Sequence, residues 1–188
     1  MAFKLDMIMR MEKGMWSNIM KIRFYLVVGA LFFGGINPAL AQEAPEFRGE
    51  YSDWSVFTRM TEAGRVCYAL SRPQDSAPRA HEHGSVYFII ASWQSGLVEA
   101  QPNILVGYDL RPASPPRVRV GSDRFDMFVD GQEGFLDDLD DEARLVRAML
   151  RGSVMRVTAT TQDGVATSYE FSLSGVTAAS QRVNALCG

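Results

Sequence analysis

Short runs of alternating apolar and polar residues follow one another from residue 51 onward and predict a β-rich domain. Trp54 and Val56 fall on one face of a strand at 51–57, and a strand at 65–71 follows a turn at 61–64, so the two are expected to form a hairpin. The run at 85–93 is apolar almost throughout, which indicates a strand covered on both faces. Further strands are expected at 103–110, 117–120, 124–129, 135–136, 154–161 and 165–173.

Two helical patterns lie in the C-terminal half. Asp140 is expected to cap a helix over 141–151, which has acidic residues in its first turn and arginines later. Ser174 is expected to cap the last helix. Their apolar stripes are Leu145, Ala148 and Met149 in the first, and Val176, Ala179, Val183 and Leu186 in the second. The predicted fold class is mainly β (α+β), an antiparallel β-sandwich or half-open barrel with two short helices in the C-terminal half.

The beginning of the chain has the pattern of a secretory signal peptide. Lys21 and Arg23 precede an uncharged run at 24–35, and an Ala-x-Ala site ends at Ala41. An uncleaved membrane anchor is the alternative, but the apolar run breaks at Gly34, Gly35 and Pro38 before reaching the length of a spanning helix. We therefore expect residues 1–41 to be removed, leaving a periplasmic or secreted protein with no transmembrane segment.

Cleavage would leave a loose, polar lead at 42–50 and one domain at 51–188. Five of the nineteen bases and two of the twenty-two acids lie in the leader, so the net charge falls from −3 to −6. A nucleic-acid binder would carry a basic surface, and this balance argues against that class.

Cys67 and Cys187 are the two cysteines, and both belong to the exported part. An oxidising compartment favours a disulfide between them. Such a bond would join the first third of the domain to its last helix. The alternative is a pair of unpaired, buried thiols.

Candidate chemistry is sparse. His81 and His83 could share a metal ion across one face of a strand, but they lie in a loop at 72–84 with no further ligand nearby. The acidic run at 133–142 lacks the spacing of a calcium loop, and its acids suit the start of a helix. No G-x-S-x-G elbow is present. We therefore predict no catalytic residue, no metal site and no cofactor, although a pair of carboxylates for glycoside hydrolysis depends on three-dimensional distances.

Aromatic residues on the predicted strands could line a ligand groove, although aromatics on strands more often belong to the core. The candidates for an interaction are Trp54, Trp93, Tyr87, Tyr108 and Phe128.

Motifs in a fixed order carry a resemblance to a known family. They are Asp53-Trp54-Ser-Val, Val66-Cys-Tyr-Ala-Leu-Ser71, Ser85-Val-Tyr-Phe88, Gly134-Phe-Leu-Asp-Asp138, Glu142-Ala-Arg-Leu-Val146, Ala148-Met149, Arg151-Gly-Ser153, Tyr169-Glu-Phe-Ser-Leu-Ser-Gly-Val-Thr-Ala-Ala179 and the terminal Cys187. Over the range 54–187 the chain resembles the invasion-associated locus B (IalB) family of exported bacterial proteins. It departs from many relatives at residues 162–165 and at Val176, and it lacks the extra cysteines of some. The resemblance implies an envelope-associated protein linked to host-cell invasion, and it supplies no catalytic residues.

The expected function is that of a non-catalytic envelope or periplasmic protein whose partner is a protein or an envelope component, with a role in host-cell contact or invasion. A first alternative is a periplasmic binder of a small molecule or an envelope polymer, which an enclosed aromatic pocket would favour. A flat, exposed apolar patch would favour a protein partner instead. A second alternative, a hydrolase, requires two carboxylates, or a serine and a histidine, within reach of each other.

Overall fold

The strands form two antiparallel sheets in the computed structural model, which describes residues 44–96 and 99–188. The seven-stranded sheet has the spatial order β1 (Glu46–Tyr51), β2 (Trp54–Thr61), β3 (Gly64–Ser71), β5 (Tyr87–Trp93), β6 (Gln101–Leu105), β10 (Glu133–Phe135), β9 (Phe128–Asp130). The five-stranded sheet has the order β4 (Asp75–Ala77), β12 (Ala166–Ser172), β11 (Val154–Thr160), β7 (Arg117–Val120), β8 (Asp123–Asp126).

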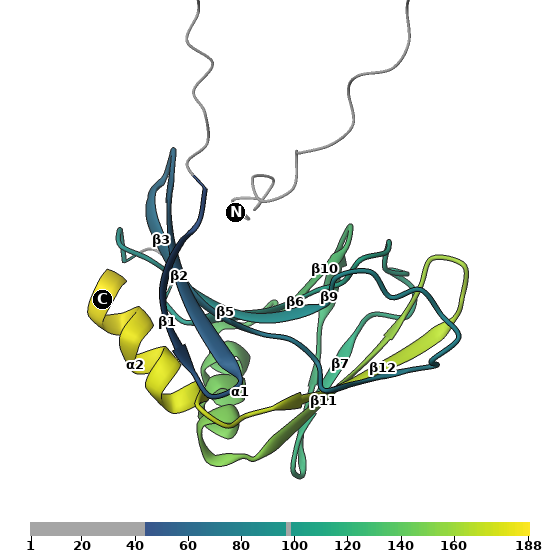
Figure 1. Ribbon diagram of the computed structural model, residues 1–188. Helices are drawn as coiled ribbons and strands as arrows, with labels where there is room; N and C mark the ends of the chain where they lie inside the picture. Colours follow the sequence, from purple (N-terminus) through teal and green to yellow (C-terminus); the bar gives the residue numbers. More distant parts are fainter. Residues whose placement is uncertain (1–43, 97–98) are drawn as a thin grey trace, which may run out of the picture. The chain divides into compact units, whose positions relative to one another are not determined.

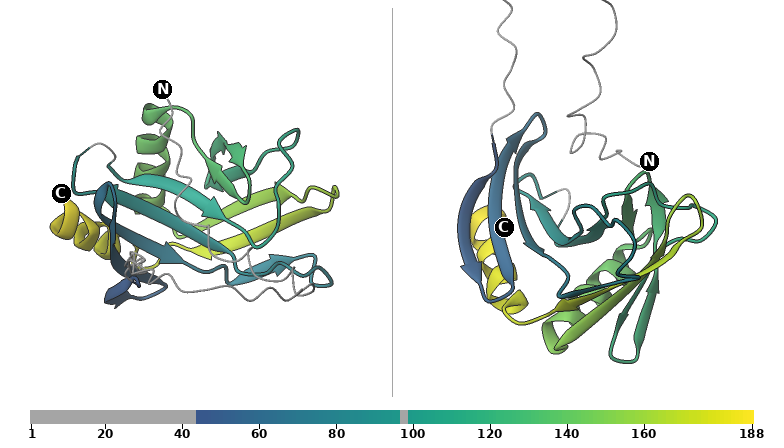
Figure 2. Two further views of the ribbon diagram at one scale, coloured as in Figure 1. Left: turned by 90° about the horizontal axis from the view of Figure 1, so that it is seen from above. Right: turned by 45° about the vertical axis from the view of Figure 1, so that its right-hand side comes forward.

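One face of the seven-stranded sheet, here called the inner face, is covered by other elements. Side chains alternate along a strand, so paired positions such as Val56, Ala69 and Ile90 share a face. Helix α2 (Val176–Cys187) packs on β1, β2, β3 and β5, and helix α1 (Leu139–Arg151) packs on β6, β7 and β8. Figure 1 shows both helices and the five-stranded sheet on this side, and Figure 2 shows the helices toward one end of the two sheets.

The core fills the space between the two sheets. The rings of Phe88 on β5 and Phe171 on β12 lie with their centroids 5.8 Å apart, edge to face. Trp54, fully buried, donates a hydrogen bond from its indole Nε1 to the carbonyl oxygen of Ser172 at 3.0 Å. These contacts confirm the predicted sandwich, and neither sheet closes into a barrel within the described residues.

The predicted disulfide is confirmed. Cys67 points from β3 to the inner face, and Cys187 is the last residue of α2. Their Cα atoms lie 5.9 Å apart, and the bond spans 120 residues of sequence. It therefore attaches the C-terminal helix to the middle of the seven-stranded sheet.

Both predicted helix caps were wrong by one or two residues. Helix α1 is capped by Asp138, whose Oδ1 accepts hydrogen bonds from the backbone N–H of Asp140 at 2.7 Å and of Asp141 at 3.1 Å. Helix α2 is capped by Gly175, which makes no side-chain hydrogen bond and has φ of 90°. A side chain at 175 would meet the carbonyl oxygen of Tyr51, so the close approach of β1 requires glycine there.

The prediction of a loose lead at 42–50 was wrong for residues 46–50, because Glu46–Tyr51 forms the edge strand β1. Its register with β2 shifts between Phe47 and Gly49, a β-bulge that breaks the alternation of apolar residues. The loop at 72–84 likewise contains the short strand β4, which pairs with β12. Alternation of apolar and polar residues did not identify either strand, because β1 contains a bulge and β4 is only three residues long.

Candidate functional site

The opposite face of the seven-stranded sheet, here called the outer face, carries an unusual number of apolar side chains. Both helices and the five-stranded sheet lie on the other side of the sheet (Figure 1). The apolar residues of the outer face are Phe47, Phe57, Val66, Tyr68, Leu70, Tyr87, Ile89, Ala91, Trp93, Leu105, Phe128 and Phe135. At about 4.8 Å between strands, seven strands extend about 29 Å across. An apolar face of that breadth is expected to have a function.

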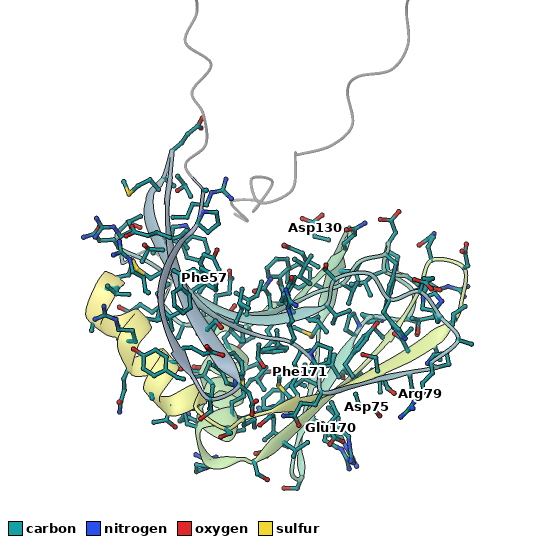
Figure 3. All side chains as sticks on the ribbon, viewed as in Figure 1. Phe57, Asp75, Arg79, Asp130, Glu170 and Phe171 are labelled. Atoms are coloured by element: carbon teal, nitrogen blue, oxygen red, sulfur yellow. A yellow bond between two sulfur atoms is a disulfide. The ribbon has the colours of Figure 1, made fainter. Side chains whose placement is uncertain are left out.

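Aromatic pairs lie at both ends of the outer face. Phe57 packs edge to face on Phe47 with centroids 5.5 Å apart and stacks on Tyr68 at 5.7 Å, so three aromatics form a run across β1, β2 and β3. Phe128 and Phe135 form a second pair at 5.7 Å on β9 and β10. Phe47 is 56% exposed and Phe128 is 44% exposed, which leaves aromatic surface free at each end. Figure 3 marks Phe57 at one end and Asp130 at the other.

Arginines lie among the aromatics of β2, β3 and β5. Arg59 follows Phe57 on the same face of β2, and its Nε atom is buried without a hydrogen-bond partner among the described residues. Burial raises the pKa of Tyr68, and the charge of Arg59 opposes part of that rise. The guanidinium of Arg72 lies 5.3 Å from the centre of the Tyr87 ring and donates a hydrogen bond to the Tyr87 hydroxyl at 3.1 Å. This end of the face therefore carries two arginines, with the exposed Glu50 of β1 on the same face.

The other end carries carboxylates. Glu133 on β10 lies opposite Leu105 on β6 and Asp130 on β9. Burial raises the pKa of Glu133 to about 7, and the charge of Asp130 acts in the same direction. The outer face thus combines an aromatic surface with arginines at one end and acidic groups at the other.

The structure distributes the predicted interaction aromatics between the two sides of the sheet. Tyr87 and Trp93 lie on the outer face. Trp54 belongs to the core, and Tyr108 packs against the core with its hydroxyl bonded to Thr167 at 2.6 Å. Sequence reasoning missed Phe57 and Tyr68, although the strand that sends Trp54 and Val56 inward must send Phe57 outward.

The two histidines take part in a polar cluster with tyrosines. His83 Nε2 donates to the carbonyl oxygen of Pro78 at 3.1 Å, because that oxygen only accepts, and Nδ1 lies 2.8 Å from the Tyr169 hydroxyl. The Tyr108 hydroxyl lies 2.8 Å from the same oxygen. Burial, together with the hydrogen bond to Tyr108, raises the pKa of Tyr169 far above its usual range. The loop at 72–84 is thus attached to β12 through His83.

His81 lies edge-on to His83, with ring centroids 5.1 Å apart, and edge-on to Tyr108 at 5.6 Å. No group of three or more potential metal ligands occurs in the part of the chain that the structure describes. Both histidine rings pack against tyrosines, and the Nε2 atom of His81 is buried without a hydrogen-bond partner among the described residues.

The acidic run at 133–142 is divided between different structural tasks. Asp138 caps α1, and Asp141 forms an ion pair with Arg144 at 2.8 Å. Glu142 is buried and accepts a hydrogen bond from Gln101 Nε2 at 3.2 Å, and burial raises its pKa. Only Glu133 belongs to the outer face.

Comparisons with protein-family models, with curated proteins and with solved structures each find no match for this chain. The resemblance to the invasion-associated locus B family thus rests on the motifs in the sequence. The predicted signal peptide at 1–41 lies outside the described residues. Within 44–96 and 99–188, no helix has the length and apolar character needed to cross a membrane.

Proposed function

We propose that this chain is an exported, non-catalytic envelope protein that binds a protein partner through the outer face of its seven-stranded sheet. The observation that carries the proposal is the aromatic surface formed by Phe47, Phe57 and Tyr68, with a second aromatic pair at the opposite end. Aromatic residues and arginine dominate the energetics of protein interfaces, and both are present here.

The shape of the surface favours a protein over a small molecule. A small ligand is normally enclosed in a concave pocket that covers most of its surface. The two hollows of about 600 Å³ described for residues 44–96 and 99–188 are lined by the five-stranded sheet and its adjoining loops, and neither is lined by aromatics of the outer face. Those aromatics instead lie across several strands, with Phe47 and Phe128 exposed.

The charges of the outer face define the complementary partner. A protein with an apolar centre, an acidic group near Arg59 and Arg72, and a basic group near Asp130 would match it. The resemblance to the invasion-associated locus B family supports an envelope location and a role in host-cell contact. An envelope polymer is the alternative ligand, because aromatic rings such as those of Phe57 and Tyr68 can also pack against sugar rings.

A pair of variants tests the proposal. In Phe57→Ser/Leu70→Ser, two apolar contacts of the outer face are replaced, and in the control Val154→Ser an exposed apolar residue of the other sheet is replaced. Immobilised mature protein should retain a discrete partner from envelope extract in the wild type and the control, but at least about tenfold less in the double variant. Equal retention by all three proteins, with circular dichroism showing that each is folded, contradicts the proposal.

The envelope-polymer alternative and the host-contact role have separate tests. If purified polymer fragments, rather than a protein, quench the fluorescence of Trp93 and the quenching is lost in the double variant, the ligand is a polymer. A deletion strain that enters host cells as well as its parent contradicts the role in invasion while leaving the binding face intact.

A further inference from the structure

Arginines line up across the outer surface of the five-stranded sheet. Arg124 on β8 lies directly opposite Arg119 on β7, and Arg119 lies directly opposite Arg156 on β11. Paired positions share a face, so the three side chains leave the same surface, and all three residues are exposed. Arg117, two residues before Arg119 on β7, lies on the same face. Adjacent strands place these side chains about 4.8 Å apart.

Only part of this positive charge is neutralised within the chain. Arg117 forms an ion pair with Asp126 at 2.7 Å, and Arg156 forms one with Glu170 at 2.8 Å. Arg119 and Arg124 form no ion pair with any residue that the structure describes. Like charges at directly opposite positions destabilise a sheet. The fold itself therefore gives no reason for two neighbouring, unpaired arginines at this place.

The arginines surround a hollow. Its volume is about 600 Å³, and its lining includes Arg117, Arg119, Arg124, Asp126, Arg156 and Thr158. That volume accommodates a small charged group together with part of the molecule that carries it. Guanidinium groups present a planar fork of donors that matches the oxygens of phosphate and carboxylate.

We propose that this hollow binds a phosphate group, carried by an envelope lipid or by a soluble phosphate ester. The unpaired guanidinium groups of Arg119 and Arg124 present two forks of donors; the two oxygens of one carboxylate fill a single fork, whereas a phosphate presents three or more oxygens and can accept from both. The net charge of the chain is negative, which argues against a long nucleic acid as the ligand. The site is separate from the proposed protein-binding face, because it lies on the other sheet. Glu170 and Asp75 continue the row of charged residues across β12 and β4, and Figure 3 shows both away from Phe57.

Binding of defined probes to the mature protein tests the site. The variant Arg119→Gln/Arg124→Gln removes the two unpaired charges, and Arg147→Gln on α1 is the control for loss of charge at an exposed arginine elsewhere. The double variant removes repulsion from the sheet, so it is expected to fold. We expect pyrophosphate to shift amide NMR signals of β7 and β8, and the double variant to bind it at least about tenfold more weakly, while Arg147→Gln binds as the wild type does.

Further probes identify the source of the phosphate and the kind of recognition. Co-sedimentation with phosphatidylglycerol vesicles but not phosphatidylcholine vesicles, lost in the double variant, assigns a lipid headgroup; pyrophosphate binding without vesicle binding assigns a soluble ester. Arg119→Lys/Arg124→Lys keeps the positive charge but removes the planar pair of N–H donors of each guanidinium group, and we expect it to bind pyrophosphate more weakly than the wild type. Equal affinity for succinate and pyrophosphate, unchanged binding by the glutamine variant, or binding of neither pyrophosphate nor vesicles overturns the proposal.

Discussion

Glu133 lies where a carboxylate is poorly solvated, between Leu105 on β6 and Asp130 on β9. It holds its proton more tightly in the folded chain than in the unfolded chain, because its pKa rises from 4.5 to about 7 on folding. Glu133 therefore lowers the free energy of unfolding, and so destabilises the folded chain, increasingly as the pH rises from about 4.5 to about 7. This residue makes the outer face sensitive to pH near neutrality.

Replacing Glu133 with glutamine should remove that dependence. We expect Glu133→Gln to be more stable than the wild type by about 1 kcal/mol or more at pH 8, and equally stable at pH 4, in urea denaturation. Glu50→Gln, at an exposed position on β1, is the matched control and should show no such difference. A constant difference between Glu133→Gln and the wild type at all pH values would contradict the burial of an ionisable carboxyl group.

Gly175 and Gly164 both have φ of 90°, but their surroundings differ. A side chain at 175 would meet the backbone of Tyr51, whereas one at 164 would meet only the end of the Arg111 side chain, at 3.2 Å. Gly175→Ala should therefore lower the free energy of unfolding by more than about 2 kcal/mol, and Gly164→Ala by about 1 kcal/mol. Thermal denaturation measures both, and equal losses would show that the approach of β1 to α2 is not tight.

At the scale of the elements, the sequence predicted the strands whose own pattern is regular. The hairpin of β2 and β3, the turn from β7 into β8, and the stripes of both helices follow from alternation or helical periodicity. The single strand predicted at 124–129 was wrong, because the chain passes there from β8 of the five-stranded sheet to β9 of the seven-stranded sheet. The strands β1, β4, β9 and β10 are short or polar and depend on a partner strand for their hydrogen bonds. The sequence did not predict that Phe57 and Tyr68, on the face away from Trp54 and Val56, belong to a site, because a sequence does not show which face of a sheet is left uncovered by other elements.

Helix α2 depends on two kinds of contact, the packing of Val176, Ala179 and Val183 and the bond between Cys67 and Cys187. Because the bond spans 120 residues, its loss should lower the free energy of unfolding by on the order of 4 kcal/mol. We expect reduction, or the variant Cys67→Ser/Cys187→Ser, to speed hydrogen exchange of the α2 amides more than that of β11 and β12. Equal protection of α2 in the oxidised and reduced protein would show that packing alone holds the helix.

At the scale of the whole described unit, two sheets give the protein two different surfaces. The outer face of the seven-stranded sheet is aromatic, with charges of opposite sign at its ends, and the outer surface of the five-stranded sheet is polar and rich in arginine. A protein partner and a phosphate-bearing component could therefore bind at the same time. Such a protein would connect an envelope component to a second protein.

Site-specific photo-cross-linking in the intact envelope tests the central claim most directly. A photoreactive phenylalanine analogue replaces Tyr68, which is half-buried on the outer face, or Val154, which is exposed on the other sheet and lines neither hollow. We expect a cross-linked product of one discrete mass from position 68, absent from position 154 and reduced by Phe57→Ser. Cross-linking to the same protein from position 154 and not from position 68 would show that the partner binds elsewhere and would contradict the proposed binding face.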